Sequence, residues 1–301
     1  MHRYLRAIGF SDPQNGKLIH NLIEQTIGKP SYRAYTSAAG DSDVMTAEYQ
    51  LELGKGLAFM VVGQYDGEGE FFREYYMPLL RREYDSTSED VAVEERMETE
   101  SYAGICDDLR VGVSLIFRLQ NVVDYAKRRN AELLPVAGTR VAFSGLCTDG
   151  MIMLPILKSE TDRRFQRTVE ENKEKLLHRA RFGDEKAIKD LTAHDMDTYS
   201  VLMDQLPDSD VYTLVDSSFM PVGVECDLYS VLGEIHRCEL VQNRISGEEV
   251  WVLTIDCNEL YFDVAINRKD LYGEPAVGRR FKGTIWLQGR IIFPDEFGPA
   301  L

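Results

Sequence analysis

Residues 44–53 read Val44-Met45-Thr46-Ala47-Glu48-Tyr49-Gln50-Leu51-Glu52-Leu53, a strict alternation of apolar and polar side chains. Successive side chains of a β-strand point to opposite faces, so this pattern predicts a half-buried strand. The buried face would carry the apolar residues Met45, Ala47, Tyr49, Leu51 and Leu53. The other face, with Thr46, Glu48, Gln50 and Glu52, is expected to lie towards solvent.

Three more strands are expected close to this one in the sequence. Gly54-Lys55-Gly56 forms a tight turn into residues 57–65, which are uniformly apolar and therefore predict a central strand. Asp66-Gly67-Glu68-Gly69 turns the chain into a strand at residues 70–77, which Pro78 ends, and residues 91–99 predict the last strand. Together these segments predict an antiparallel meander.

Two helices are expected to cover this sheet. The first follows an extended segment at residues 1–10, begins at Ser11 or Asp12, and carries Leu18, Leu22 and Ile23 on its apolar side. The second has an apolar side formed by Ile116, Leu119, Val123 and Ala126. A hairpin at Asp149-Gly150 then closes the first domain at residue 157.

The rest of the chain divides into a charged helical part and a β-rich part. Residues 158–208 contain helix caps such as Ser159, Asp184 and Thr192, and predict a helical connector. Residues 209–301 contain five or so short strands separated by glycines, the last of them at residues 280–292, which favours a small barrel of the OB type or a similar one. The predicted class is α+β, with domains at 1–157, 158–208 and 209–301.

Composition limits the compartment and the class of partner. The chain has 50 acidic residues against 34 Lys and Arg, a formal net charge of −16, which disfavours nucleic acid and anionic lipid surfaces. No stretch approaches the roughly 20 apolar residues that a membrane-spanning helix requires. The five cysteines are odd in number and form no C-x-x-C pair, which favours free thiols. We therefore expect a soluble cytoplasmic protein.

Three segments resemble a known family. They are residues 1–10 (MHRYLRAIGF), residues 112–125 (GVSLIFRLQNVVDY) and residues 219–227 (FMPVGVECD). With these segments the chain resembles the uncharacterised bacterial proteins of the domain of unknown function 3881, over nearly its whole length. The resemblance implies an intracellular bacterial protein, and it supplies no activity, cofactor or catalytic residue to transfer.

The motifs that would carry catalysis are incomplete. Phe143-Ser144-Gly145 misses the nucleophile elbow by one glycine, and Gly54-Lys55-Gly56 lacks the helix start that a phosphate cradle requires. His236 lies two residues from Cys238, a spacing that suits a buried thiol beside a satisfied histidine as well as a reactive pair. His194, Asp195 and Asp197 fit the first turn of a capped helix. We therefore assign no catalytic residue, no metal ligand and no cofactor.

The best candidate for a binding surface is the basic and aromatic stretch at residues 277–290. The candidate residues are Trp251, Arg279, Arg280, Phe281, Lys282, Trp286 and Arg290, because small barrels bind ligands on strand-borne aromatic side chains beside cations. Residues 209–301 nevertheless hold 15 acidic residues against 8 Lys and Arg. The competing interpretation is that the cations pair with Glu274, Asp270 or Asp263 while Trp286 fills the core.

The sequence thus favours a non-enzymatic binding or scaffolding protein that uses an aromatic and basic face of the barrel. Its expected partner is another protein or a second copy of the chain, since the net charge disfavours nucleic acid and no membrane segment is expected. Two alternatives stay open. One is a carboxylate- or metal-dependent hydrolase with its site between the domains, marked by His194 or His236. The other is a protein that binds single-stranded nucleic acid.

Overall fold

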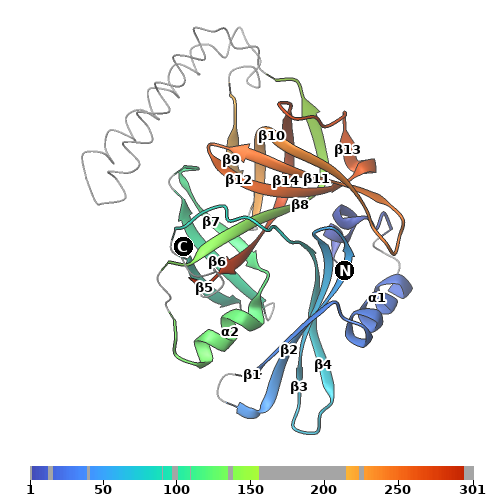
Figure 1. The fold of residues 1–301 in the computed structure, drawn as a ribbon, viewed down its shortest axis with the longest axis vertical. Coiled ribbons are helices and arrows are strands. Elements are labelled where there is room, and N and C mark those ends of the chain that lie inside the picture. The colour runs from blue at the N-terminus through green and yellow to red at the C-terminus, as the bar shows by residue number, and fades with distance from the viewer. Residues whose placement is uncertain are drawn as a thin grey trace, which may run out of the picture.

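The computed structural model describes residues 2–12, 16–38, 41–89, 91–96, 101–108, 110–134, 138–155, 215–223 and 227–294. The fold is α+β, as the sequence predicts, with an antiparallel sheet below a small closed barrel in the view of Figure 1. The helical connector expected at 158–208, and His194 within it, lie outside the described residues.

The first sheet has four antiparallel strands in the order β1-β2-β3-β4. Their bounds are β1 (Tyr32–Ala38), β2 (Asp41–Gly54), β3 (Leu57–Tyr65) and β4 (Phe71–Leu80). The sequence predicts β3 with its correct bounds, and its first seven residues are all buried. β4 runs through Pro78, which pairs with Phe59 across the strands, instead of ending before it.

The N-terminal segment was expected to be extended, and this expectation is wrong. Residues 3–8 form a 3₁₀-helix, η1 (Arg3–Ile8), before the predicted helix α1 (Gly16–Gly28). The buried residues of η1 are Tyr4, Leu5, Ala7 and Ile8, three apart in two rows, which is the spacing of a 3₁₀-helix and not of a strand. Gly9 ends the helix with a φ of 95°, where a Cβ would lie 3.0 Å from Asn243.

The second sheet contains the barrel and three further antiparallel strands. Five strands close the barrel in the order β8-β12-β11-β10-β14, with β14 pairing again with β8. These strands are β8 (Arg140–Met153), β10 (Leu228–Gln242), β11 (Glu249–Cys257), β12 (Leu260–Asn267) and β14 (Arg280–Ile292). β9 (Ser218–Pro221) pairs with β10, and β13 (Leu271–Tyr272) follows the short η2 (Arg268–Asp270) and pairs with β8.

The three added strands are β5 (Val91–Arg96), β6 (Ser101–Asp108) and β7 (Val113–Leu119), and β7 joins the end of β14. A helix was expected to include Ile116 and Leu119, but both residues belong to β7. The helix, α2 (Val122–Asn130), begins only after them. Leu115, Phe117 and Leu119 are buried, whereas Ile116 and Arg118 between them are only half-buried. Burial along this stretch therefore repeats every two residues, which is the period of a strand.

The hairpin expected at Asp149-Gly150 is also wrong, because β8 runs straight through this dipeptide. β8 pairs with β14 on one edge and with β12 and then β13 on the other, so partners hold it extended along its length. A Cβ on Gly150 would lie 2.8 Å from the Phe281 ring. The glycine therefore serves close packing inside the barrel and not a turn.

The barrel is built from both ends of the chain. β8 comes from the expected domain at residues 1–157, whereas β10, β11, β12 and β14 come from residues 209–301. The boundaries expected at 157 and 209 therefore do not separate two sheets. The predicted small barrel is present, and it includes β8 between β12 and β14 in addition to the strands of residues 209–301.

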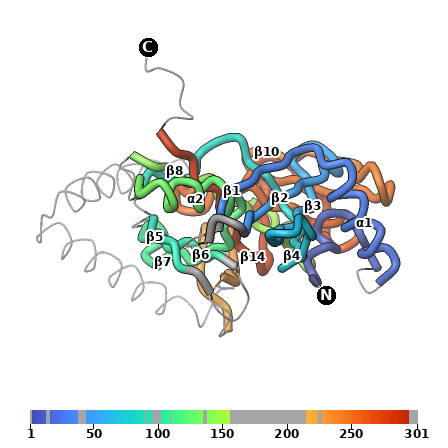
Figure 2. The backbone as a smooth tube through the Cα atoms, turned by 90° about the horizontal axis from the view of Figure 1, so that it is seen from below, coloured from blue at the N-terminus to red at the C-terminus, as the bar shows by residue number. Residues whose placement is uncertain are grey.

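Two of the four residues of the polar face of β2, Glu48 and Gln50, are buried, contrary to expectation, while Thr46 and Glu52 are half-buried. Glu48 is 1% exposed and Gln50 is 6% exposed. α2 packs beside β1 and β2, as Figures 1 and 2 both show, and covers this face. Because the first sheet is covered on its polar row, Glu48 is a buried carboxyl group.

Candidate functional site

The two aromatic residues expected on the binding face of β14 are buried. Phe281 has no exposed surface and belongs to the barrel core. Trp286 is 4% exposed and stacks on Tyr4 of η1, with ring centroids 5.2 Å apart and planes 14° apart. The Trp286 Nε1–H donates to Asp227 Oδ2 at 3.0 Å. Trp286 therefore packs in the core, as the competing interpretation predicts, and it also joins the N-terminal segment to the barrel.

The cations of the expected face bond to backbone carbonyls of the same chain or are half-buried. Arg280 is buried, and its Nε and Nη1 atoms donate to the backbone carbonyls of Leu154 (3.2 Å) and Val215 (3.0 Å). Burial lowers the pKa of the Arg280 guanidinium. Arg279 donates to the backbone carbonyl of Glu274 at 2.7 Å, and Lys282 and Arg290 are half-buried.

The carboxylates proposed as partners for these cations have other partners. Asp270 forms a two-bond ion pair with Arg6, and Asp263 pairs with Arg82 at 2.5 Å. Trp251, the remaining candidate, is half-buried on β11 and packs against the barrel core.

A different surface has the character expected of a binding face. The three most exposed large apolar side chains among the described residues are Tyr272 (82%), Leu154 (73%) and Val277 (67%). Met151, which is 43% exposed, pairs with Tyr272 of β13 on one side and with Lys282 of β14 on the other. We call Met151, Leu154, Tyr272 and Val277 the β13 corner.

The β13 corner is held in place by backbone contacts. After Tyr272 the chain turns at Gly273, whose φ is 92° and where a Cβ would lie 3.1 Å from Ile152 of β8. The loop then reaches Arg279, whose backbone carbonyl accepts from the N–H of Ile235 at 2.8 Å. The exposed side chains therefore project from a fixed backbone.

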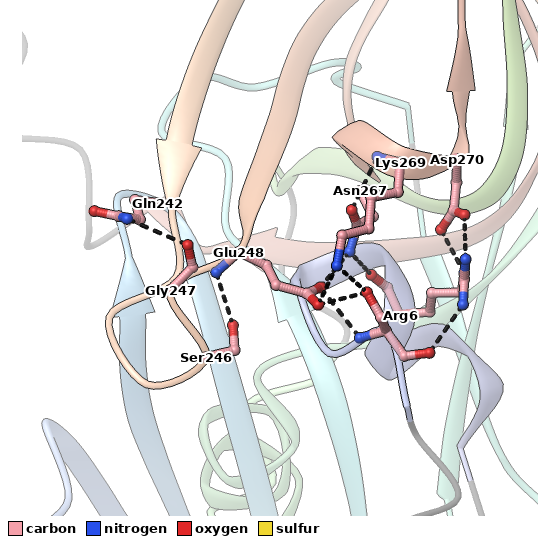
Figure 3. Close-up of polar contacts among 9 residues, drawn as sticks. Arg6, Gln242, Ser246, Gly247, Glu248, Asn267, Lys269 and Asp270 are labelled. Atoms are coloured by element: carbon pink, nitrogen blue, oxygen red, sulfur yellow. Dashed lines mark hydrogen bonds and ion pairs between the residues drawn. The ribbon is translucent and has the colours of Figure 1, made fainter.

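Beside this corner, a polar network ties η1 to the barrel (Figure 3). Glu248 accepts hydrogen bonds from Lys269 Nζ (2.7 Å), Asn267 Nδ2 (2.7 Å) and the Ser11 hydroxyl (2.5 Å). These donors outweigh burial and lower the pKa of the Glu248 carboxyl. Arg6 adds its ion pair with Asp270 just before β13.

An open pocket of about 300 Å³ lies at this network, lined by Glu249, Asn267, Arg268 and Lys269. Arg268 pairs with Glu249 at 2.6 Å and Lys269 pairs with Glu248 at 2.7 Å. The charged groups of the pocket are therefore paired with one another. This arrangement suits a structural clamp between η1 and the barrel better than a site that awaits a charged ligand.

The groups considered for catalysis are not arranged for it. Burial raises the pKa values of the Cys106, Cys147 and Cys257 thiols to about 12, and the four described cysteines form no disulfide with one another. Ser144 is 1% exposed and its hydroxyl donates to the Leu80 carbonyl at 2.6 Å.

His236 lies on the outside of the barrel at a bulge in β10, 3.5 Å from Asp256 and against the Tyr261 ring. The position of His236 therefore does not support a hydrolase site between the domains. Within the described ranges, no group of three or more His, Cys, Asp or Glu could hold a metal ion.

Comparison with known proteins identifies the family. A family model described as "Domain of unknown function, E. rectale Gene description (DUF3881)" matches residues 5–289. The chain belongs to the DUF3881 family. The match spans η1, the four-stranded sheet and nearly all of the barrel, so this architecture is that of a DUF3881 protein. No curated protein and no solved structure matches the chain.

Sequence reasoning missed the β13 corner of this DUF3881 protein. The sequence pattern predicts a loop at Tyr272-Gly273-Glu274-Pro275 and a hairpin strand at Met151, and neither prediction indicates a binding surface. The sequence does contain a signal that Tyr272 is exposed, because a tyrosine directly before the turn residues Gly-Glu-Pro has few neighbouring residues that could bury its ring. The partner strand of Met151 could not be deduced, since its pairing with Tyr272 of β13 joins residues 121 positions apart. Among the described residues, no helix is both long and apolar enough to cross a bilayer.

Proposed function

We propose that this DUF3881 protein is a cytoplasmic, non-enzymatic binding protein that contacts a protein partner through the β13 corner. The observation that carries the proposal is that the three most exposed large apolar side chains among the described residues, Leu154, Tyr272 and Val277, lie on adjoining segments. Tyr272 pairs with Met151 of β8, and Arg280, three residues after Val277, donates to the Leu154 carbonyl. Contiguous exposed apolar surface on a soluble protein marks an interaction site more often than scattered apolar residues do. Aromatic side chains and methionine are also enriched at protein interfaces.

The chemistry of the β13 corner favours a protein over a nucleic acid. Tyr272, Met151 and Lys282 lie in one row across β13, β8 and β14, giving an aromatic ring, a thioether and one cation. A nucleic-acid surface requires several cations in a tract, and the chain as a whole carries a net charge of −16. An apolar contact surface on a folded partner protein, or on a second copy of the chain, fits this row better.

Affinity capture from the native lysate tests the proposal with three versions of the full chain. They are the wild type, Tyr272→Ala at the corner, and Phe72→Ala as a matched control on β4. Phe72 is 61% exposed, so both variants remove an exposed aromatic ring and leave the core unchanged. Mass spectrometry of the captured proteins and small molecules gives the readout, and size-exclusion chromatography of each version reports self-association.

We expect one protein to be captured in stoichiometric amount by the wild type and by Phe72→Ala, and to be lost with Tyr272→Ala. A dimer that dissociates only in Tyr272→Ala would identify a second copy as the partner. Equal capture by all three versions would refute the role of the corner. A bound metabolite or metal ion in place of a protein would favour the hydrolase alternative.

A further inference from the structure

Glu48 is a buried carboxyl group with no counter-charge beside it. Its Oε1 atom accepts from Gln50 Nε2 at 2.7 Å, and its Oε2 atom accepts from the backbone N–H of Val123 at 3.4 Å. Within the described part of the chain, no Lys, Arg or His lies within ion-pair distance of it, and Lys127 of α2 instead lies 4.0 Å from Asp124. An ionised carboxylate in such a place is costly unless it takes up a proton.

Glu48 contacts the first turn of α2 because the helix lacks a cap of its own. Asn121 occupies the N-cap position, but its side chain makes no cap hydrogen bond. The Asn121 side chain bonds to β14 instead. Its Nδ2 atom donates to the Ile291 carbonyl at 2.8 Å, and its Oδ1 atom accepts from the Ile291 N–H at 3.1 Å. The N–H groups of the first helical turn need outside acceptors, and Glu48 supplies one from β2.

The other end of α2 is fixed to the same sheet by a contact that does not titrate. Asn130, the last residue of the helix, donates to the Ser37 carbonyl of β1 at 2.6 Å. α2 is thus attached to the four-stranded sheet at both ends. Only the Glu48 end can change its charge.

Titratable groups of α2 and β4 bear on Glu48. α2 presents Asp124, which favours the neutral carboxyl, and Lys127, which favours the ionised one. β4 presents Tyr75, which in turn faces Arg118 of β7 and Tyr102 of β6. Burial is the largest influence and outweighs the two hydrogen-bond donors, so the pKa of Glu48 rises to about 7.

Two buried polar atoms close to Glu48 have no hydrogen-bond partner among the described residues, Gln50 Oε1 and Tyr75 Oη. If the Gln50 amide turns over, its Oε1 atom can accept from a protonated Glu48 hydroxyl, while the Glu48 carbonyl oxygen keeps the Val123 contact. The neutral carboxyl can therefore supply the donor that Gln50 Oε1 lacks. The ionised carboxylate leaves Gln50 Oε1 without a donor.

We propose that Glu48 is a proton-operated latch between the four-stranded sheet and α2. The latch is closed when the carboxyl is protonated. When the carboxyl ionises, α2 opens from the sheet more often, because opening admits water to the charge. The latch concerns the joint between the sheet and α2 and does not depend on the β13 corner.

Hydrogen exchange on the full-length chain at pH 5.5 and pH 8.5 tests the latch, with rates corrected for the intrinsic effect of pH. A pKa that rises from 4.5 to about 7 in the closed state predicts that the opening equilibrium of α2 increases about 30-fold between these pH values. α1 packs on the same sheet through Ile19, Leu22 and Ile23 and should show no such increase. An equal loss of protection in α1, or none in α2, would overturn the proposal.

Two variants give the second arm of the test. Glu48→Gln stays neutral at all pH values, so α2 should keep the same protection at pH 8.5 as at pH 5.5. Glu52→Gln is the matched control on the same strand, since Glu52 is half-exposed and pairs with Arg244 at 3.4 Å. It should behave like the wild type. A wild-type response to pH in Glu48→Gln would refute the latch. If that variant fails to fold, the comparison of protection in α1 and α2 of the wild type still tests the latch.

Discussion

Replacing Trp286 by phenylalanine separates its structural role from the binding role that the sequence suggests. The variant keeps an aromatic ring against Tyr4 but removes the Nε1–H that donates to Asp227. Asp227 is 9% exposed, so its carboxylate loses a donor that water replaces poorly. A hydrogen bond to a buried charged group contributes about 2 kcal/mol, and we expect Trp286→Phe to lower the free energy of unfolding by that amount. Trp286→Ala should cost about 4 kcal/mol, since it also leaves a cavity.

Urea denaturation followed by far-UV circular dichroism measures these losses. Trp251→Phe is the control, because Trp251 is the other tryptophan of the chain and is only half-buried. It should lower the stability by less than Trp286→Phe does. In the double variant Trp286→Phe with Asp227→Asn, the two effects should not add, because both remove the same hydrogen bond. If Trp286→Ala changed the free energy of unfolding by less than about 1 kcal/mol, the assignment of Trp286 to the core would be refuted.

Three further predictions concern packing and charge. Gly104→Ala should lower the free energy of unfolding by about 2 kcal/mol, because a Cβ there would lie 2.1 Å from the buried Phe117 ring. Urea denaturation measures this loss, and an unchanged urea midpoint would contradict the packing. Arg82→Ala should cost about 3 kcal/mol, since it leaves the mostly buried Asp263 carboxylate without its cation, and Asp263→Asn should recover part of the loss. In thermal unfolding, the stability of the wild type relative to Glu48→Gln should be highest below pH 4.5 and should fall by about 3 kcal/mol as the pH rises from 4.5 through 7, the folded-state pKa of Glu48, and a constant difference between the two proteins would contradict this.

The parts of the fold that the sequence predicts are those fixed by local patterns. β3 is uniformly apolar between two glycine turns, and its bounds are correct to the residue. β14 is also predicted with its correct bounds, Arg280–Ile292. In both cases the alternation or apolarity of the strand itself, together with its turns, carries the information.

The failures have a common physical cause, which is pairing or packing with distant residues. β8 is held extended through Asp149-Gly150 by β14 and β13, whose residues lie more than 100 positions away. Glu48 follows the pattern of a solvent-facing residue, and only the position of α2 makes it buried. A sequence pattern reports that a face is polar and cannot report which element covers it.

The candidate site shows the same limit. Arg280 is of the residue type expected for a ligand-binding cation. Its side chain nevertheless bonds to two backbone segments of the same chain, at Leu154 and Val215. Trp286 is of the residue type on which a ligand could stack, yet the ring that stacks on it is Tyr4 of the same chain. Residue type predicts the kind of contact correctly in both cases, but it does not indicate whether the contact is made within the chain or with a partner.

Buried polar groups join the four-stranded sheet to the barrel, and this joint determines which variants can report on binding. Gln288 has no exposed surface, donates to the Pro78 carbonyl of β4 at 2.8 Å, and accepts from Gln120 Nε2 at 3.0 Å. A satisfied buried network of this kind fixes the relative position of two layers, and a change within it alters the whole fold. Loss of binding in a Trp286 or Gln288 variant would therefore say nothing about the interface. Tyr272 lies outside these contacts with 82% of its surface exposed, so the loss of a partner on its substitution would identify the interface itself.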